Sequence, residues 1–241
     1  MKKIPMHILL IIMLLFFARA ATAETTPESD QKIKYASFSE LSREEKPDVD
    51  FRVAYRPGRK SFLLTAPHGG AIEPGSTEIA AALAGDQFGL YTFNGLKRDS
   101  SVLYLPSTNF DEPELVRVTN IYSTTISVHV ISGTDRLVYI GGRYRQLTSL
   151  ISQSLKEKGY DVKPLPETSP AFSMSNFINK TAAGGVQLEI SSALAEKMFR
   201  GPITSERVRQ DMTRRTVDFT RFAEAVRLVL QRAAPKGQER K

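Results

Sequence analysis

Short apolar runs alternate with amphipathic stretches along most of the chain. The apolar runs are rich in Val, Ile, Leu, Tyr and Phe, a composition typical of buried β-strands. Between them, apolar residues recur at helical spacing, as in 143–159, where Leu147, Ile151 and Leu155 share one face and Gly159 marks the end. This pattern predicts strands at 61–66, 88–94, 101–106, 124–130, 136–142 and 185–191, and helices at 75–85, 111–123 and 143–159.

The order of these elements predicts an α/β fold. Strands alternate with helices, as in a three-layer α/β/α sandwich with a mixed, largely parallel central sheet. Residues 205–233 complete the pattern as one long amphipathic helix with many arginines. Its basic face has two readings, a nucleic-acid or membrane surface or the solvated side of a helix packed on the sheet. We adopt the second reading, because a solvated face is the more common origin of such a pattern.

The first 23 residues have the features of a secretory signal peptide. Lys2 and Lys3 precede an apolar core at 8–18, and small residues at 21–23 form a cleavage site. The alternative is a retained membrane anchor, but the core is shorter than the roughly 20 residues needed to cross a bilayer. We therefore expect a secreted or periplasmic protein with no stable membrane anchor after cleavage.

Four segments are predicted from the composition along the chain. The signal peptide at 1–23 is followed by a polar, flexible N-terminal lead at 24–50 with one helical turn at 38–45. A single α/β domain spans 51–234, and residues 235–241 form a frayed tail. The formal charge of +7 falls to near +4 when the signal peptide is removed, and this modest excess indicates no nucleic-acid partner.

Cysteine and histidine counts restrict the chemistry available to the chain. There is no cysteine, so disulfides and thiolate metal ligands are excluded, and any metal site must use histidine and carboxylate. Signal cleavage leaves His68 and His129 as the remaining histidines. Each follows or ends a predicted strand, as does Glu189. Ligands of open α/β sheets bind beyond the carboxyl ends of strands, so these three side chains are expected to converge.

The stretch from Leu63 to Ala80, LLTAPHGGAIEPGSTEIA, supplies a third ligand. Zinc binds imidazole and carboxylate and keeps one position open in catalytic sites, so we predict one Zn²⁺ ion held by His68, Glu73 and His129. The glycines at 69 and 70 allow the turn that brings Glu73 back. Glu78 competes for this role, but we place it in the first turn of the helix at 75–85, where the helix dipole favours a carboxylate.

Glu189 lies within an otherwise apolar strand. Burying a carboxylate there is costly unless it is paired or faces a polar cleft. Two readings remain open: a structural ion pair, or a catalytic general base that takes a proton from water.

Seven segments in order resemble the poly-γ-glutamate hydrolase family. The likeness covers about 52–199. It implies a zinc-carboxypeptidase-like fold, zinc held by His68, Glu73 and His129, and Glu189 as the catalytic carboxylate. It further implies cleavage of an amide formed by a glutamate side chain. The segments are PHGGAIEPGSTEIA, LYTFNGLK, STNFDEPEL, SVHV, VYIGG, SNFINK and GVQLEIS.

The segment SNFINK is implied to hold the anionic glutamyl polymer or peptide through Asn176, Asn179 and Lys180. Four features depart from the family pattern. Tyr104 stands where a histidine is expected, and the glycine expected directly after His129 is delayed to position 133. Lys180 replaces an arginine and lacks its planar, two-pronged guanidinium. No arginine follows the strand in SSALAEK.

The sequence thus predicts an exported zinc-dependent amidohydrolase that cleaves γ-glutamyl amide bonds. Two alternatives remain. A periplasmic peptidoglycan amidase or peptidase has a similar HGG motif but commonly places its ligand glutamate farther from the first histidine, which would select Glu78. A non-catalytic exported binding protein on the same fold is consistent with the altered Tyr104 and Lys180.

Overall fold

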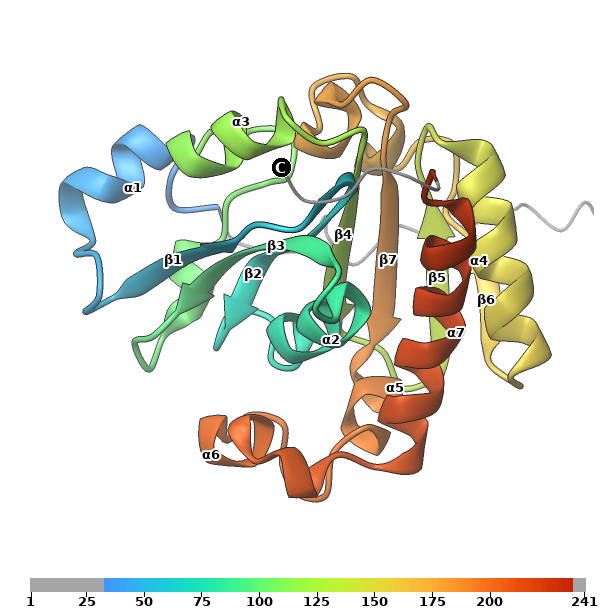
Figure 1. Cartoon of the computed structure of the whole chain (residues 1–241). Helices are drawn as coiled ribbons and strands as arrows, with labels where there is room; N and C mark the ends of the chain where they lie inside the picture. The colour runs from blue at the N-terminus through green and yellow to red at the C-terminus, as the bar shows by residue number, and fades with distance from the viewer. Residues whose placement is uncertain (1–32, 236–241) are drawn as a thin grey trace, which may run out of the picture.

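The computed structural model describes residues 33–235. Its centre is a seven-stranded sheet with the strand order β1-β3-β2-β4-β7-β5-β6 (Figure 1). The β1–β3 and β5–β7 pairs are antiparallel, and the other neighbours are parallel, so the sheet is mixed and largely parallel as predicted. The strands are β1 (Phe51–Arg56), β2 (Arg59–Gly70), β3 (Phe88–Gly95), β4 (Thr124–Ile131), β5 (Leu137–Gly141), β6 (Asp161–Pro164) and β7 (Val186–Ser191).

Helices cover both faces of this sheet and confirm the three-layer arrangement (Figure 1). Helices α2, α4 and α7 pack on one face, whereas α1, α3 and η4 pack on the other. The α-helices are α1 (Phe38–Glu44), α2 (Ser76–Ala84), α3 (Pro113–Thr119), α4 (Arg145–Glu157), α5 (Ser192–Lys197), α6 (Glu206–Gln210) and α7 (Val217–Ala233). Short 3₁₀ helices are η2 (Ser100–Leu103), η3 (Pro170–Phe172), η4 (Phe177–Lys180) and η5 (Met212–Arg214).

The central strands β4 and β7 are buried on both faces, but the two faces differ in chemistry. Successive side chains of a strand point to opposite sides. On one side Val128 and Leu188 join the apolar core beneath α2, α4 and α7. On the other side His129, Gln187 and Glu189 form a buried polar stripe. The alternation therefore places the chemically active residues on a single face of the sheet.

Two sequence predictions about strands were incomplete or wrong. Residues 101–106 are not a strand: η2 and a loop replace it, because Leu103 and Leu105 reach the apolar core around Tyr91 by packing onto the sheet face. Strands β1 and β6 were missed. Both lie at the edges of the sheet, where many side chains are exposed and the apolar signal is weak.

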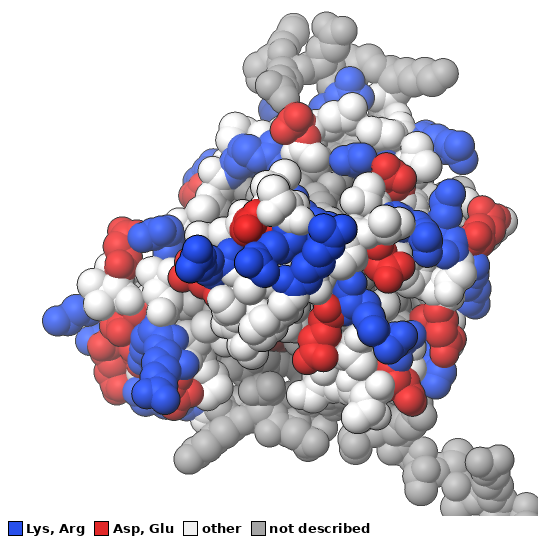
Figure 2. All heavy atoms as spheres, turned by 90° about the horizontal axis from the view of Figure 1, so that it is seen from below, with Lys and Arg blue, Asp and Glu red and all other residues white. Residues whose placement is uncertain are grey.

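The single helix predicted at 205–233 is also wrong, because the segment is α6, η5 and α7 in succession. Asp211 accepts a hydrogen bond from the Thr213 backbone and caps η5, and Thr216 caps α7. The Thr216 backbone N–H donates to Met198 O at 3.0 Å, which ties the break to the segment after α5. Lys and Arg side chains gather on the molecular face that α6 and the start of α7 form (Figure 2).

The N-terminal lead is corrected over the part that the structure describes. Residues 33–50 are packed rather than flexible: Tyr35 and Leu41 are buried in the same apolar cluster as Phe51. The Tyr35 hydroxyl also donates to Glu45 Oε1 at 2.6 Å. The predicted signal peptide and residues 24–32 and 236–241 lie outside the described residues. Among residues 33–235, no helix is both long enough and apolar enough to span a membrane.

Candidate active site

The structure brings His68, Glu73 and His129 together in one buried cluster. His68 Nδ1 lies 2.9 Å from Glu73 Oε1 and 3.3 Å from His129 Nδ1. His129 Nδ1 lies 3.4 Å from the same Glu73 oxygen. One donor atom from each residue therefore points to a common centre, although the residues come from β2, the turn after it and β4.

The turn between β2 and α2 places Glu73 beside His68. The Glu73 N–H donates to His68 O at 2.8 Å, and Ser76 Oγ donates to Glu73 O at 2.8 Å. Gly70 has a φ of +68°, which favours glycine. A Cβ at Gly69 would lie 2.2 Å from Thr77 Oγ1, so a side chain there would collide with α2. The predicted need for two glycines in this turn is confirmed.

Hydrogen bonds fix which atoms of the cluster face its centre. His68 Nε2 lies 2.7 Å from Leu105 O, and a carbonyl only accepts, so Nε2 carries a proton and the neutral imidazole has its lone pair on Nδ1. Glu73 Oε2 accepts from the Val130 N–H at 3.0 Å and lies 3.3 Å from His129 Nδ1, while Oε1 lies within 3.4 Å of both imidazoles. The donors are thus oriented by the protein itself.

The chemistry of these donors fits a divalent cation. Burial alone would raise the pKa of Glu73, but attraction to His129 and His68 outweighs it and lowers that pKa to about 2. An ionised carboxylate and two imidazole nitrogens, all within 4.8 Å of one another, are a ligand set that transition metals accept.

Glu189 lies next to this cluster in the sheet. It is the register partner of His129 on the neighbouring parallel strand, so both side chains point to the same face. Its side chain is buried, and Oε1 accepts a hydrogen bond from Gln187 Nε2 at 2.8 Å. Gln187 Oε1 in turn accepts from Asn176 Nδ2 at 3.3 Å, and Asn176 Oδ1 accepts from the Ile178 N–H at 3.1 Å. This chain of amides holds one oxygen of the Glu189 carboxyl in place.

A cavity of about 200 Å³ opens beside these residues. Its wall combines the β2–α2 turn, the carboxyl ends of β4 and β7, and the segment around α5 and α6. The lining residues are Ile72, Glu73, Pro74, Tyr104, His129, Val130, Ile131, Ser132, Glu189, Ser192, Glu196, Ile203 and Thr204.

Tyr104 forms part of this wall. Its ring centroid lies 4.3 Å from that of His68, at an interplanar angle of 34°. The ring is buried and covers one side of the imidazole. The residue that departs from the expected histidine therefore contacts the ligand cluster directly.

Glu78 lies outside the cluster. It is in the first turn of α2, as predicted, and its Oε1 lies 3.4 Å from Arg209 Nε. Burial raises the pKa of Glu78, while Arg209 opposes that rise. Arg209 also donates to Ile203 O, so the pair fastens the cavity wall onto α2. Sequence reasoning missed Arg209, because its position in the assumed long helix gave no signal.

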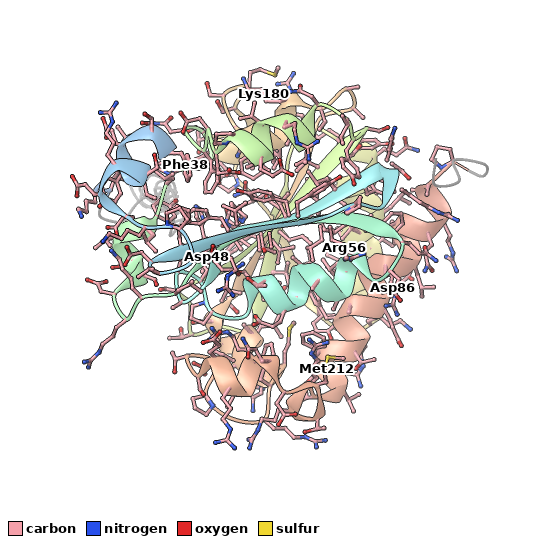
Figure 3. All side chains as sticks on the ribbon, turned by 60° about the vertical axis from the view of Figure 1, so that its left-hand side comes forward. Phe38, Asp48, Arg56, Asp86, Lys180 and Met212 are labelled. Atoms are coloured by element: carbon pink, nitrogen blue, oxygen red, sulfur yellow. The ribbon has the colours of Figure 1, made fainter. Side chains whose placement is uncertain are left out.

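The residues of SNFINK do not line the cavity. Asn176 belongs to the amide chain behind Glu189, and Asn179 is buried with its amide bonded to Ala171 O, Ser173 O and the Gly185 N–H. Lys180 is exposed and lies at the top of the molecule (Figure 3), near the start of β7, whereas the cavity adjoins the strand's carboxyl end. This geometry gives both asparagines a structural role and places Lys180 away from the cavity.

Comparison with known proteins places these residues in a family. The sequence model of the family "Poly-gamma-glutamate hydrolase" matches residues 35–225. The chain belongs to this family. It is therefore a hydrolase that acts on amide bonds, and the whole cluster lies within the matched region. The alternative of a non-catalytic binding protein is not favoured, because His68, Glu73, His129 and Glu189 are all present and adjacent.

Two relatives of this chain come from Bacillus subtilis (strain 168). YndL is 30% identical over 202 residues, covering 82% of this chain and 78% of YndL. The prophage-derived protein YoqZ is 33% identical over 170 residues, covering 69% of this chain and 61% of YoqZ. The chain thus spans less than two thirds of the length of YoqZ.

Two solved structures share the fold of the family hydrolase. A bacteriophage poly-gamma-glutamate hydrolase superposes with a TM-score of 0.79 at 28% identity, covering 83% of this chain and 98% of that one. A zinc-free form of YndL has a TM-score of 0.77 at 29% identity, with the same coverage of both chains.

Proposed function

We propose that this protein is an exported, zinc-dependent amidohydrolase that cleaves γ-glutamyl amide bonds. The convergence of His68, Glu73 and His129 beside Glu189 carries this proposal. The bacteriophage relative supports a poly-γ-glutamate-like substrate, and the zinc-free form of YndL supports zinc as the metal. Export rests on the signal-peptide features of residues 1–23.

The three ligand atoms would be His68 Nδ1, Glu73 Oε1 and His129 Nδ1, which lie within 3.4 Å of one another. Zinc bound there would polarise the scissile carbonyl and lower the pKa of an attacking water. The hydrogen bond from His68 to Leu105 O keeps the imidazole in the ligating tautomer and orientation. The hydrogen bond from the Val130 N–H to Glu73 Oε2 likewise fixes the orientation of the carboxylate.

Glu189 is the general base of the proposed reaction. Its carboxylate lines the cavity on the same face of the sheet as His129, where it can take a proton from water and pass it to the leaving amine. Gln187 holds Oε1 through its amide, so the carboxylate does not need to reorient before proton transfer.

The placement of Glu78 bears on the peptidoglycan-amidase alternative. That alternative selected Glu78 as the ligand, but Glu78 is paired with Arg209 on α2, and Glu73 occupies the cluster. Peptidoglycan stem peptides nevertheless contain a γ-linked glutamate. A muropeptide therefore belongs in the substrate screen as a competing outcome.

The test combines metal content with turnover. Elemental analysis of the purified protein is expected to give one zinc per chain, and poly-γ-glutamate is expected to be shortened. The Glu189→Gln variant should keep its zinc and lose turnover by at least about 100-fold, the lower range for loss of a general base. A zinc-loaded Glu189→Gln variant as active as the parent would contradict the proposed base. Turnover of muropeptides but not of the polymer would reassign the substrate.

A further inference from the structure

A second hollow on the molecule differs from the catalytic cavity in its charge. It is a groove of about 440 Å³ between the end of α4, the segment after α5 and the start of α7. Four basic side chains line it, against one acidic side chain, Glu224. The lining residues are Lys158, Arg200, Arg215, Thr216, Val217, Thr220, Arg221 and Glu224.

Two of these four cations are exposed and have no ion-pair partner in the part of the chain that the structure describes. Within residues 33–235, Lys158 and Arg200 are exposed and form no side-chain ion pair. Arg221 has one partner, Asp218, whose Oδ1 accepts a hydrogen bond from Arg221 Nη1 at 3.4 Å. Cations without partners repel one another, so an anion in the groove would relieve that repulsion as well as bind directly.

Arg215 is held in a fixed position within the groove. Its guanidinium lies 4.6 Å from the centroid of the Phe219 ring, and its Nε is enclosed by protein. Burial lowers the pKa of Arg215, although the guanidinium stays charged at neutral pH. A partly desolvated, immobilised guanidinium loses little side-chain entropy when it binds a carboxylate.

The groove and the catalytic cavity are connected by the segment after α5, which contributes to both. Arg200 lines the groove, and Ile203 lines the cavity only three residues later, so their Cα atoms are at most about 11 Å apart. The Arg200 N–H donates to Arg214 O at 2.7 Å, which fixes this connecting segment beside η5. Figure 2 shows Lys and Arg side chains on the molecular face that α6 and the start of α7 form, with Asp and Glu side chains between them.

We propose that this groove is an accessory binding site for a γ-linked glutamyl polymer whose scissile bond lies in the cavity. The proposal rests on the proposed function for the substrate class, but the groove itself is outside the catalytic residues. A γ-linked glutamyl polymer carries a free carboxylate on every residue, and guanidinium groups bind carboxylates in two-pronged pairs. The groove would hold several residues of the chain while a neighbouring bond is hydrolysed, and it would favour long substrates over short ones.

The experiment measures polymer binding without turnover. In a Glu189→Gln background, the groove cations are removed by the triple change Lys158→Gln, Arg200→Gln and Arg221→Gln. A matched control removes three exposed cations elsewhere, by Arg43→Gln, Arg136→Gln and Arg232→Gln. The affinity for poly-γ-glutamate should fall about tenfold in the groove variant, since an exposed ion pair contributes roughly two- to threefold. It should change less than about twofold in the control.

A second measurement uses the parent catalytic residues. Both triple variants should cleave a short γ-glutamyl dipeptide with an unchanged kcat/KM, whereas only the groove variant should show a raised KM for the long polymer. Equal losses of polymer binding in the two triples would refute a specific site, and so would no loss in the groove triple. Tighter, groove-dependent binding of DNA would reassign the occupant. Groove-dependent polymer binding by a parent that cleaves no γ-glutamyl bond would uphold the site and refute the proposed function.

Discussion

Replacing Gln187 by Leu tests whether the chain of amides behind Glu189 contributes to catalysis. The substitution removes the 2.8 Å hydrogen bond to Glu189 Oε1 and nearly preserves side-chain volume. Gln187 is fully buried, so water does not readily replace the lost amide. Asn176 keeps its hydrogen bonds with Pro170 O and the Ile178 N–H, which limits the damage to the surrounding loop.

The magnitude follows from the type of hydrogen bond. A bond to a carboxylate contributes about 1.5–3 kcal/mol, and about 1.4 kcal/mol corresponds to tenfold in rate. If most of this energy orients Glu189 in the transition state, kcat falls about 10- to 100-fold while KM and zinc content are unchanged. The free energy of unfolding should fall by about 1–3 kcal/mol, the cost of leaving a buried Asn176 donor with fewer partners.

The assay compares kcat, KM and zinc per chain for Gln187→Leu, for Gln187→Glu and for the parent. The control is Gln153→Leu, which removes an exposed glutamine that bonds Glu157 on α4 and should leave all three quantities unchanged. An unchanged kcat for Gln187→Leu would show that Glu189 needs no positioning by this amide. If a lower zinc content accounted for the entire fall in kcat, the proposed role of Gln187 in positioning Glu189 would also be refuted.

Two further substitutions test the walls of the site. Arg209→Met leaves the Glu78 carboxylate buried without its partner. It should lower the free energy of unfolding, measured by urea denaturation, by about 3 kcal/mol. The double variant with Glu78→Gln should recover much of that loss. A double variant no more stable than Arg209→Met would show that the unpaired Glu78 carboxylate is not the cause of the lost stability. Gly69→Ala places a methyl group 2.2 Å from Thr77 Oγ1. It should lower the free energy of unfolding by about 1–3 kcal/mol and weaken zinc binding. A fully stable variant that binds zinc normally would show that α2 can move away.

Much of the site could be predicted because strand ends in a parallel sheet converge. His129 and Glu189 are register partners on neighbouring strands, and their convergence was indicated by the position of each residue at the end of an apolar run. Glu73 could be chosen over Glu78 because two glycines allow a tight turn, and the structure has that turn. The position of a residue in its strand and the backbone conformations that glycine allows determine these features, and both are properties of the local sequence.

The errors involve features that depend on tertiary contacts. Residues 101–106 have strand composition, yet Leu103 and Leu105 gain more by packing across the sheet face than by pairing at its edge. The break near Asp211 depends on backbone hydrogen bonds to residues distant in sequence, so helical periodicity alone did not reveal it. The sequence did contain a signal for the role of Gln187. It is a second polar residue in an apolar strand, two positions before Glu189, so the alternation of the strand places both side chains on the same face.

The most direct test of the central claim is the zinc content of two matched variants, Glu73→Gln and Glu78→Gln. Glu73 Oε1 is within 3.4 Å of both imidazole nitrogens, whereas Glu78 is paired with Arg209, so only the first substitution should remove a ligand. Glu73→Gln is expected to lose nearly all bound zinc, and Glu78→Gln is expected to retain about one zinc per chain. Full zinc in Glu73→Gln, or its loss only in Glu78→Gln, would contradict the proposed metal site.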